Sequence, residues 1–146
     1  MFLLRNGKFI EMDSVTRYTE ASFKHGFKQL FGSPKNKFAI IAEDTKAKFR
    51  INEQALIFYT RYNTNKLEIV KFTVQHEKKR RYIFVVHLVG SNMGEVFPKE
   101  DAFDIDSEKL TSGIYKITLK KPLIDGEYGI IVSYERSYLI YDFGIE

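Results

Sequence analysis

The end of the chain constrains the fold most, because it reads as two β-strands separated by turn residues. From Leu123 to Glu146 the sequence is LIDGEYGIIVSYERSYLIYDFGIE. The runs YGIIVSY and YLIYDF are rich in β-branched and aromatic residues, which favour strands. Glu135-Arg136-Ser137 separates the two runs, and this arrangement predicts a β-hairpin.

The rest of the chain repeats this pattern. Asn6-Gly7 lies between two short apolar runs, and Asn-Gly is typical of a two-residue hairpin turn. Further strands are predicted at residues 38–42, 48–52, 55–62, 67–74, 82–88, 102–105 and 114–119. About nine strands separated by turn residues predict an all-β fold, an antiparallel, immunoglobulin-like β-sandwich. At most one short helical turn is expected, at Lys28–Phe31 within the irregular segment Thr19–Lys37.

The segment Leu67–Val74, LEIVKFTV, changes the phase of its apolar residues partway along. Leu67 and Ile69 share one face of a strand, whereas Val70, Phe72 and Val74 share the other. A β-bulge inserts one residue and reverses the facing of those that follow. We therefore expect a bulge near Ile69–Val70.

Composition supports one domain spanning residues 1–146, since 44% of the residues are hydrophobic. The chain has no cysteine, so neither disulfides nor thiolate metal sites are expected. The opening MFLLRNGKF lacks the features of a signal peptide, and no apolar run is long enough to span a membrane. A cytoplasmic location is the resulting expectation.

Asp125-Gly126-Glu127-Tyr128 resembles the corner of immunoglobulin-like sandwiches, where a strand-initiating tyrosine bonds back to the backbone. Tyr128, Ile130 and Val132 share one strand face, as that corner requires. Gly126 would make the bend, because glycine adopts conformations that other residues resist. The alternative is an ordinary entry from a loop into a strand.

The same ending is similar to that of small bacterial all-β domains of unknown function. Those domains carry Pro-Gly-Glu-Tyr, a strand, and a closing Phe-x-Phe-Gly-Ile/Val, for which this chain has Tyr141 to Ile145. Phe49-Arg50-Ile51 and the run ALIFY, residues 55–59, resemble an earlier strand pair of the family. Asp125 replaces the family's proline. The resemblance implies a sandwich fold, brings no established activity and assigns no functional residues.

The sequence shows no constellation of catalytic or metal-binding residues. His25, His76 and His87 are separated from one another, and none is paired with a second ligand at metal-binding spacing. No phosphate-binding or nucleophile motif is present. Asp104, Asp106 and Glu108 lack the spacing of a calcium loop and suggest a solvated edge. Neither a cofactor nor an enzymatic activity is expected.

Charge is unevenly distributed, although the formal net charge is only +4. Residues 1–81 carry 17 Lys and Arg against 8 Asp and Glu, whereas residues 82–146 carry 6 against 11. Lys78, Lys79, Arg80 and Arg81 precede Tyr82 and form a candidate anion-binding site for nucleic acid or an anionic surface. The same run also suits a solvated hairpin tip.

These features favour a non-catalytic β-sandwich module that binds a protein partner, since tyrosine is enriched at interfaces. Outward-facing side chains would support this hypothesis, and the candidates are Tyr18, Tyr59, Tyr62, Tyr134 and Tyr138. The first alternative is an electrostatic binder acting through Lys78–Arg81. The second is a hydrolase-type enzyme with a cleft that joins His25 or His87 to a carboxylate. A homodimer through an edge strand is a further possibility.

Overall fold

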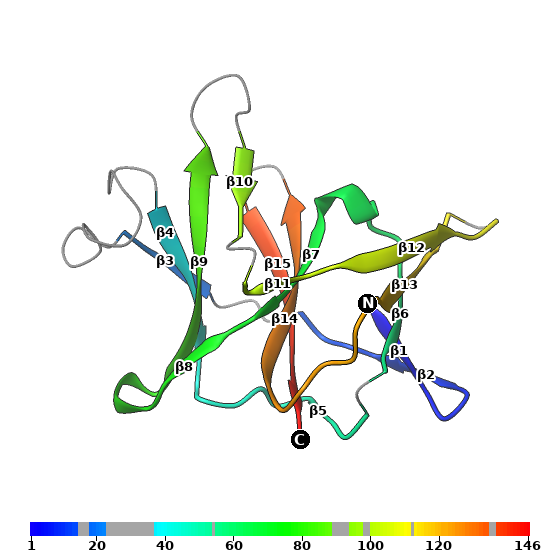
Figure 1. Ribbon diagram of the computed structural model, residues 1–146, viewed down its shortest axis with the longest axis horizontal. Coiled ribbons are helices and arrows are strands. Elements are labelled where there is room, and N and C mark those ends of the chain that lie inside the picture. Colours follow the sequence, from blue (N-terminus) through cyan, green and yellow to red (C-terminus); the bar gives the residue numbers. More distant parts are fainter. Residues whose placement is uncertain are drawn as a thin grey trace.

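The computed structural model describes residues 1–14, 18–22, 37–53, 55–88, 94–97, 100–111, 113–134 and 137–146. Strands dominate these residues, which confirms the prediction of an all-β chain. They form three sheets, named here A, B and C, and neighbouring strands pair antiparallel except for one parallel pair. Figure 1 shows the three sheets side by side, with sheet C at the left, sheet B in the centre and sheet A at the right.

Sheet A contains the N-terminal hairpin and one of the later hairpins. In spatial order its strands are β12 (Ile105–Lys109), β13 (Tyr115–Leu119), β6 (Ile57–Thr60), β1 (Phe2–Arg5) and β2 (Lys8–Glu11). Asn6 and Gly7 join β1 to β2 with φ angles of 49° and 72°. The hairpin predicted from Asn6-Gly7 is therefore confirmed, because both turn residues adopt the positive φ that a type I′ turn requires.

Sheet B is built around the two long C-terminal strands. Its order is β11 (Ala102–Phe103), β7 (Leu67–Lys71), β14 (Gly126–Tyr134), β15 (Ser137–Ile145) and β5 (Arg50–Ile51). The predicted C-terminal hairpin is present, with β14 paired to β15 along its whole length. The short strand β5 pairs parallel to β15 at the end of the chain.

Sheet C combines strands from the first and middle parts of the chain. Its order is β10 (Gly94–Val96), β9 (Arg80–Leu88), β4 (Lys37–Glu43) and β3 (Tyr18–Ser22), with β8 (Thr73–Gln75) also paired to β9. Residues 23–36, including most of the irregular segment and the helical turn expected at Lys28–Phe31, lie outside the described residues.

Sheet B is covered on both faces, because a hydrophobic core lies on each side of it. One core, between sheets A and B, includes Leu3, Phe58 and Phe143. The other, between sheets B and C, includes Ile40, Ile83 and Ile131. Three sheets around two cores differ from the expected pair of sheets around a single core.

Strand β7 shows the consequence of this layering. Leu67 and Ile69 belong to the core with sheet A, whereas Val70 and Phe72 belong to the core with sheet C. The register with β14 is unbroken from Leu67 to Lys71. The prediction of a bulge at Ile69–Val70 is therefore wrong. Both faces of β7 carry apolar residues because each face packs into a different hydrophobic core.

At two places the chain passes directly from a strand of one sheet to a strand of the next sheet. The chain passes from β7 in sheet B through Phe72 to β8 in sheet C, and from β11 in sheet B through Asp104 to β12 in sheet A. Bends of this kind make the corners between packed sheets. They divide the chain into more strands than the nine expected from sequence.

Short helical turns are also more numerous than predicted. The 3-10 turns η2 (Thr64–Lys66) and η3 (His76–Lys78) occupy two strand connections. The Asn63 side chain accepts a hydrogen bond from the Asn65 N–H at the start of η2, and this capping favours a helical turn. Lys79 ends η3 with a left-handed conformation.

The start of β14 forms the hydrogen bond that a tyrosine corner requires. The Tyr128 hydroxyl donates to the Ile124 carbonyl at 2.7 Å. Its ring is fully buried and stacks on Phe143, with 5.7 Å between the ring centroids. Gly126 has a φ of 159°, and a Cβ there would lie 3.3 Å from the Tyr128 ring. The hydrogen bond from Tyr128 to Ile124 ties the loop before β14 to the strand itself.

Candidate interaction surface and charged cleft

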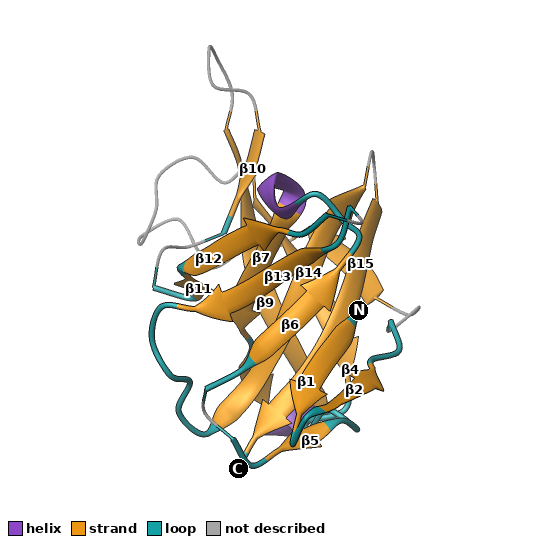
Figure 2. Cartoon of the chain, turned by 90° about the vertical axis from the view of Figure 1, so that its right-hand side faces the viewer, coloured by secondary structure: helices purple, strands orange, loops and turns teal. Residues whose placement is uncertain are grey.

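The outer face of sheet A carries apolar side chains that no described part of the chain covers fully. Strand alternation places Leu3, Phe58 and Ile117 in the core, and each of these residues is fully buried. Their strand neighbours therefore point outward. The resulting set, named here the aromatic face, consists of Phe2, Leu4, Phe9, Ile57 and Tyr59. Figure 2 views sheet A from this outer side.

Cross-strand pairing makes the aromatic face continuous. Leu4 lies opposite both Phe9 and Ile57, and Phe2 lies opposite Tyr59. The rings of Phe9 and Tyr59 pack edge to face, with 5.0 Å between their centroids. Phe9 nevertheless remains 62% exposed and Phe2 41% exposed. These are two of the three large hydrophobic side chains that are most exposed in the described part of the chain.

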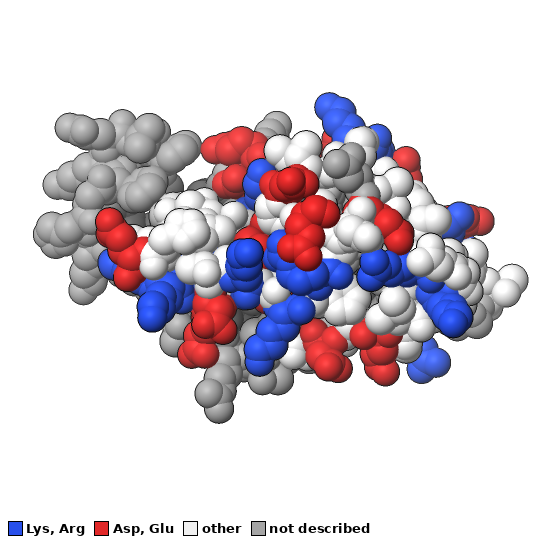
Figure 3. Space-filling view, turned by 90° about the horizontal axis from the view of Figure 1, so that it is seen from below, with Lys and Arg blue, Asp and Glu red and all other residues white. Residues whose placement is uncertain are grey.

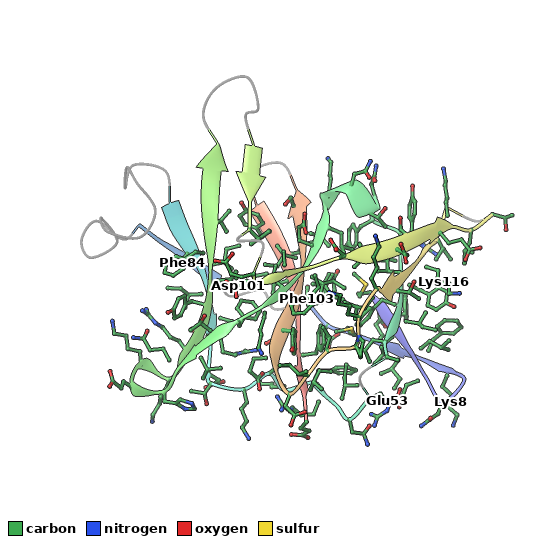
Figure 4. All side chains as sticks on the ribbon, in the orientation of Figure 1. Lys8, Glu53, Phe84, Asp101, Phe103 and Lys116 are labelled. Atoms are coloured by element: carbon green, nitrogen blue, oxygen red, sulfur yellow. The ribbon has the colours of Figure 1, made fainter. Side chains whose placement is uncertain are left out.

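Charged side chains surround the aromatic face. Glu11 lies opposite Phe2, and Lys116 lies opposite Tyr59 and pairs with Glu108 at 4.0 Å. Figure 4 shows Lys116 on the same side of the molecule as the β1–β2 hairpin. An apolar centre within a polar rim is the usual arrangement of a protein-binding surface.

A second feature is a cleft of about 580 Å³ where the chain crosses between sheets. Its walls come from the end of β2 and the segment after it, and from the end of β4 and the connection to β5, while β9 and β15 contribute one residue each. Most of the lining is charged, and it consists of Glu11, Met12, Asp13, Ser14, Glu43, Asp44, Lys46, Lys48, Phe49, Arg81 and Asp142.

Arg81 is the most buried charged residue of this cleft, with 2% of its surface exposed. Its Nη2 atom lies 2.6 Å from the Asp142 carboxylate, and the guanidinium donates to the carbonyls of Glu43 and Asp44 at 3.0 Å each. Nη1 lies 3.7 Å from Glu127 and has no hydrogen-bond acceptor among the described residues. Arg81 thereby links sheet C to two carboxylates of sheet B.

Glu127 extends this network toward the end of the chain. Its carboxylate accepts from the Ala47 N–H at 2.7 Å and from Arg50 at 2.5 Å, and Arg50 also pairs with Glu146 at 3.1 Å. Burial lowers the pKa of Arg50, but its bonds and charge interactions with Glu127 and Glu146 raise that pKa above its usual value. Arg50 therefore stays charged and holds β5 against β15.

Gly144 makes room for Arg50. A Cβ built at Gly144 would lie 1.5 Å from Nη1 of Arg50 and 2.2 Å from its Cζ. The guanidinium therefore occupies the space over β15 that any larger side chain at position 144 would fill. The sequence prediction missed Arg50, Glu127 and Asp142 as a group, because Arg50 on β5 is distant in the chain from the β14–β15 hairpin that carries Glu127 and Asp142.

The structure separates the predicted anion-binding residues. Lys78 and Lys79 are exposed on the β8–β9 connection, Arg80 donates to Gln75 at 2.8 Å, and Arg81 points into the carboxylate network. Arg81 shares its strand face with the buried residues Ile83 and Val85, and this alternation was the available signal for its position. Figure 3 shows positive and negative side chains interspersed on the lower face of the molecule.

The candidate histidines and tyrosines are scattered. His76 is exposed, His87 lies on β9 opposite Glu95, and His25 lies outside the described residues. Tyr59 and Tyr62 are half-buried, and Tyr138 is buried. The side chains of Tyr18 and Tyr134 lie outside the described part of the structure.

Acidic residues gather where β7 meets β11. Burial, and then the charge of Asp104, raises the pKa of Glu68. Burial also raises the pKa of Asp101, with a further contribution from Glu100. Within the described ranges, no group of three or more His, Asp or Glu is placed to hold a metal ion.

Comparisons with known proteins return no family model, no curated protein and no solved structure that matches this chain. In the described part of the chain, no helix is long and apolar enough to cross a membrane.

Proposed function

We propose that this protein is a non-catalytic β-sheet module that binds a protein partner through the aromatic face of sheet A. The observation that carries the proposal is Phe9, which is 62% exposed on the edge strand β2 and belongs to an apolar cross-strand cluster. Lone exposed hydrophobic residues are ordinary, but a contiguous set with a charged rim is typical of interaction sites.

The energetics of the aromatic face favour binding. Burying a phenylalanine side chain stabilises a complex by about 1.5–3 kcal/mol relative to leaving it in water. The rings of Phe9 on β2 and Tyr59 on β6 already pack edge to face across the strand β1 that separates them. A surface ordered before binding loses little conformational entropy when the partner arrives. The immunoglobulin-like assignment of the fold is part of the same proposal, supported by the Tyr128–Ile124 bond.

The two alternatives have weaker support. Nucleic-acid binding requires Lys78–Arg81 to act together, whereas Arg81 is engaged by Asp142 at 2.6 Å. A hydrolase requires a cleft with convergent nucleophile, base and acid groups. The described lining of the charged cleft offers carboxylates, lysines and Arg81, and the carboxylates nearest Arg81 are already paired with it.

Site-specific photocrosslinking in the producing cell tests the proposal. A benzoylphenylalanine at position 9 retains an aromatic ring on the aromatic face, and the same group at the exposed position Lys78 provides a matched control. We expect a discrete protein adduct from position 9 that is absent from position 78. The same adducts from both positions, or none from position 9, would contradict the proposal.

A further inference from the structure

The turn between β1 and β2 is formed by Asn6 and Gly7, and both residues are exposed. Asparagine is among the thermally labile residues of proteins. The chain has six asparagines, at positions 6, 36, 52, 63, 65 and 92, and only the first is followed by glycine. No described residue forms a hydrogen bond with the Asn6 side-chain amide. The carbon of this amide is therefore open to attack.

The backbone nitrogen of Gly7 is the nucleophile next to that amide. The strand ladder ends at the pair of Arg5 and Lys8, and the Gly7 N–H has no backbone acceptor among the described residues. Glycine has no side chain to shield its nitrogen, and even a Cβ built at Gly7 meets no atom within 4 Å. Exposed hairpin tips open locally at low cost in free energy, which lets the Asn6 side chain turn toward this nitrogen.

We propose that Asn6 is a site of spontaneous deamidation and that its isoaspartyl product displaces Phe9 within the aromatic face. The deprotonated Gly7 nitrogen forms a bond to Cγ of Asn6, and the bond from Cγ to Nδ2 breaks, so that ammonia leaves and a succinimide ring remains. Water then opens this ring at either carbonyl. One opening gives aspartate, and the other gives isoaspartate, in which the main chain runs through Cβ. Water is the co-reactant, and nothing is oxidised or reduced.

The other described asparagines lack this combination of a free amide and a free nitrogen. The Asn52 side-chain oxygen accepts a hydrogen bond from Arg5. The Asn63 side-chain oxygen accepts from the Asn65 N–H at 3.0 Å. The backbone nitrogen that follows Asn65 donates to the Asn63 carbonyl, also at 3.0 Å. We therefore expect the reaction to select Asn6.

The isoaspartyl product lengthens a turn that has no spare residue. Two residues with positive φ close the hairpin, and a two-residue loop of this kind fixes the strand register. An additional main-chain atom at position 6 therefore disturbs the pairing of Leu4 with Phe9. Phe9 then leaves its edge-to-face contact with Tyr59. The effect on partner binding rests on the proposed function, whereas the chemistry at Asn6 does not.

Incubation of the purified full chain at mildly alkaline pH tests the chemistry. Digestion after glutamate releases residues 1–11, 44–53 and 54–68, which carry Asn6, Asn52 and the two asparagines of η2 and its cap. Mass spectrometry of these peptides follows the loss of each amide. We expect loss at Asn6 before loss at the other three positions. The loss should be slower at mildly acidic pH, because less of the Gly7 nitrogen is deprotonated.

Freshly prepared Asn6→Asp is the matched control for the structural consequence. It carries the same new charge as the isoaspartyl form but lacks the additional main-chain atom. We expect the nuclear magnetic resonance signals of the Phe9 and Tyr59 rings to shift in the separated isoaspartyl form relative to Asn6→Asp. The signals of Phe143, in the core between sheets A and B, should be the same in both.

An Asn6 amide that outlasts those of Asn52, Asn63 and Asn65 would overturn the proposed modification site. Identical ring signals in the isoaspartyl form and in Asn6→Asp would overturn its link to the aromatic face. Photocrosslinking from position 9 of the freshly made chain depends on neither result, so a failure of the proposed function is distinguishable from a failure of this inference.

Discussion

At the scale of single residues, the role of a buried glycine depends on the side chain that packs against its backbone. Gly144 is buried in β15, and the Arg50 guanidinium lies directly above its backbone. In the sequence this glycine belongs to the closing Phe-Gly-Ile of a β-strand, a position where glycine is unfavourable. The structure explains it through packing, since Arg50 reaches Glu127 and Glu146 only across this gap.

Gly144→Ala is therefore expected to destabilise the fold by about 1–3 kcal/mol, the usual result of overpacking. In an Arg50→Ala background the same substitution should be close to neutral or slightly stabilising, because alanine suits a strand better than glycine. Denaturant unfolding of the four proteins in this double-mutant cycle gives the coupling energy. Equal effects in both backgrounds would mean that Arg50 is not the obstacle.

At the scale of strands, the sequence predicts local features well and the relations between sheets poorly. The Asn6-Gly7 turn and the alternating runs identify β1, β2, β14 and β15, because turn chemistry and strand periodicity are local properties. The apolar pattern of Leu67–Val74 misleads, since alternation does not reveal that one strand lies between two cores. The short strand β10 was also missed, because it lies between the strands predicted at residues 82–88 and 102–105.

The same limit applies to the candidate sites. The run Lys78–Arg81 is a patch in the sequence, but strand alternation turns Arg81 inward while Lys78 remains exposed. The aromatic face depends on pairing of the β1–β2 hairpin with β6, which is distant from it in the chain. Tyr59 could be named from the sequence as a candidate contact residue. The position of Phe9 beside it could be recognised only from the register of β1 with β2 and β6.

Tyr128→Phe tests the strand-scale interpretation of the loop before β14. The variant keeps the ring that stacks on Phe143 and removes only the hydroxyl that donates to Ile124. We expect a loss of about 1 kcal/mol in the free energy of unfolding, the net value of one hydrogen bond. Tyr59→Phe is the control, because its ring lies on the exposed face of sheet A. Equal stability changes in the two variants would show that the corner bond contributes nothing.

At the scale of the whole molecule, three sheets around two cores leave charged residues between layers. Arg81 from sheet C lies against Asp142 and Glu127 from sheet B, at one end of the core that contains Ile83 and Ile131. A buried ion pair is a weak source of net stability, because desolvation opposes the attraction. We expect it to specify how the layers dock, since any other alignment would leave these charges without partners.

Arg81→Met should therefore destabilise the protein by about 3–5 kcal/mol, because it leaves the largely buried Asp142 carboxylate without its cation and leaves Glu127 with Arg50 alone. Lys78→Met removes the same charge three residues earlier in the chain, at an exposed position, and should change stability by less than about 0.5 kcal/mol. Chemical denaturation monitored by circular dichroism gives both values. Similar stabilities for the two variants would mean that the network does not join sheets B and C. A large loss confined to Arg81→Met would assign the last cation of the basic run to folding, and leave Lys78, Lys79 and Arg80 for any contact with an anion.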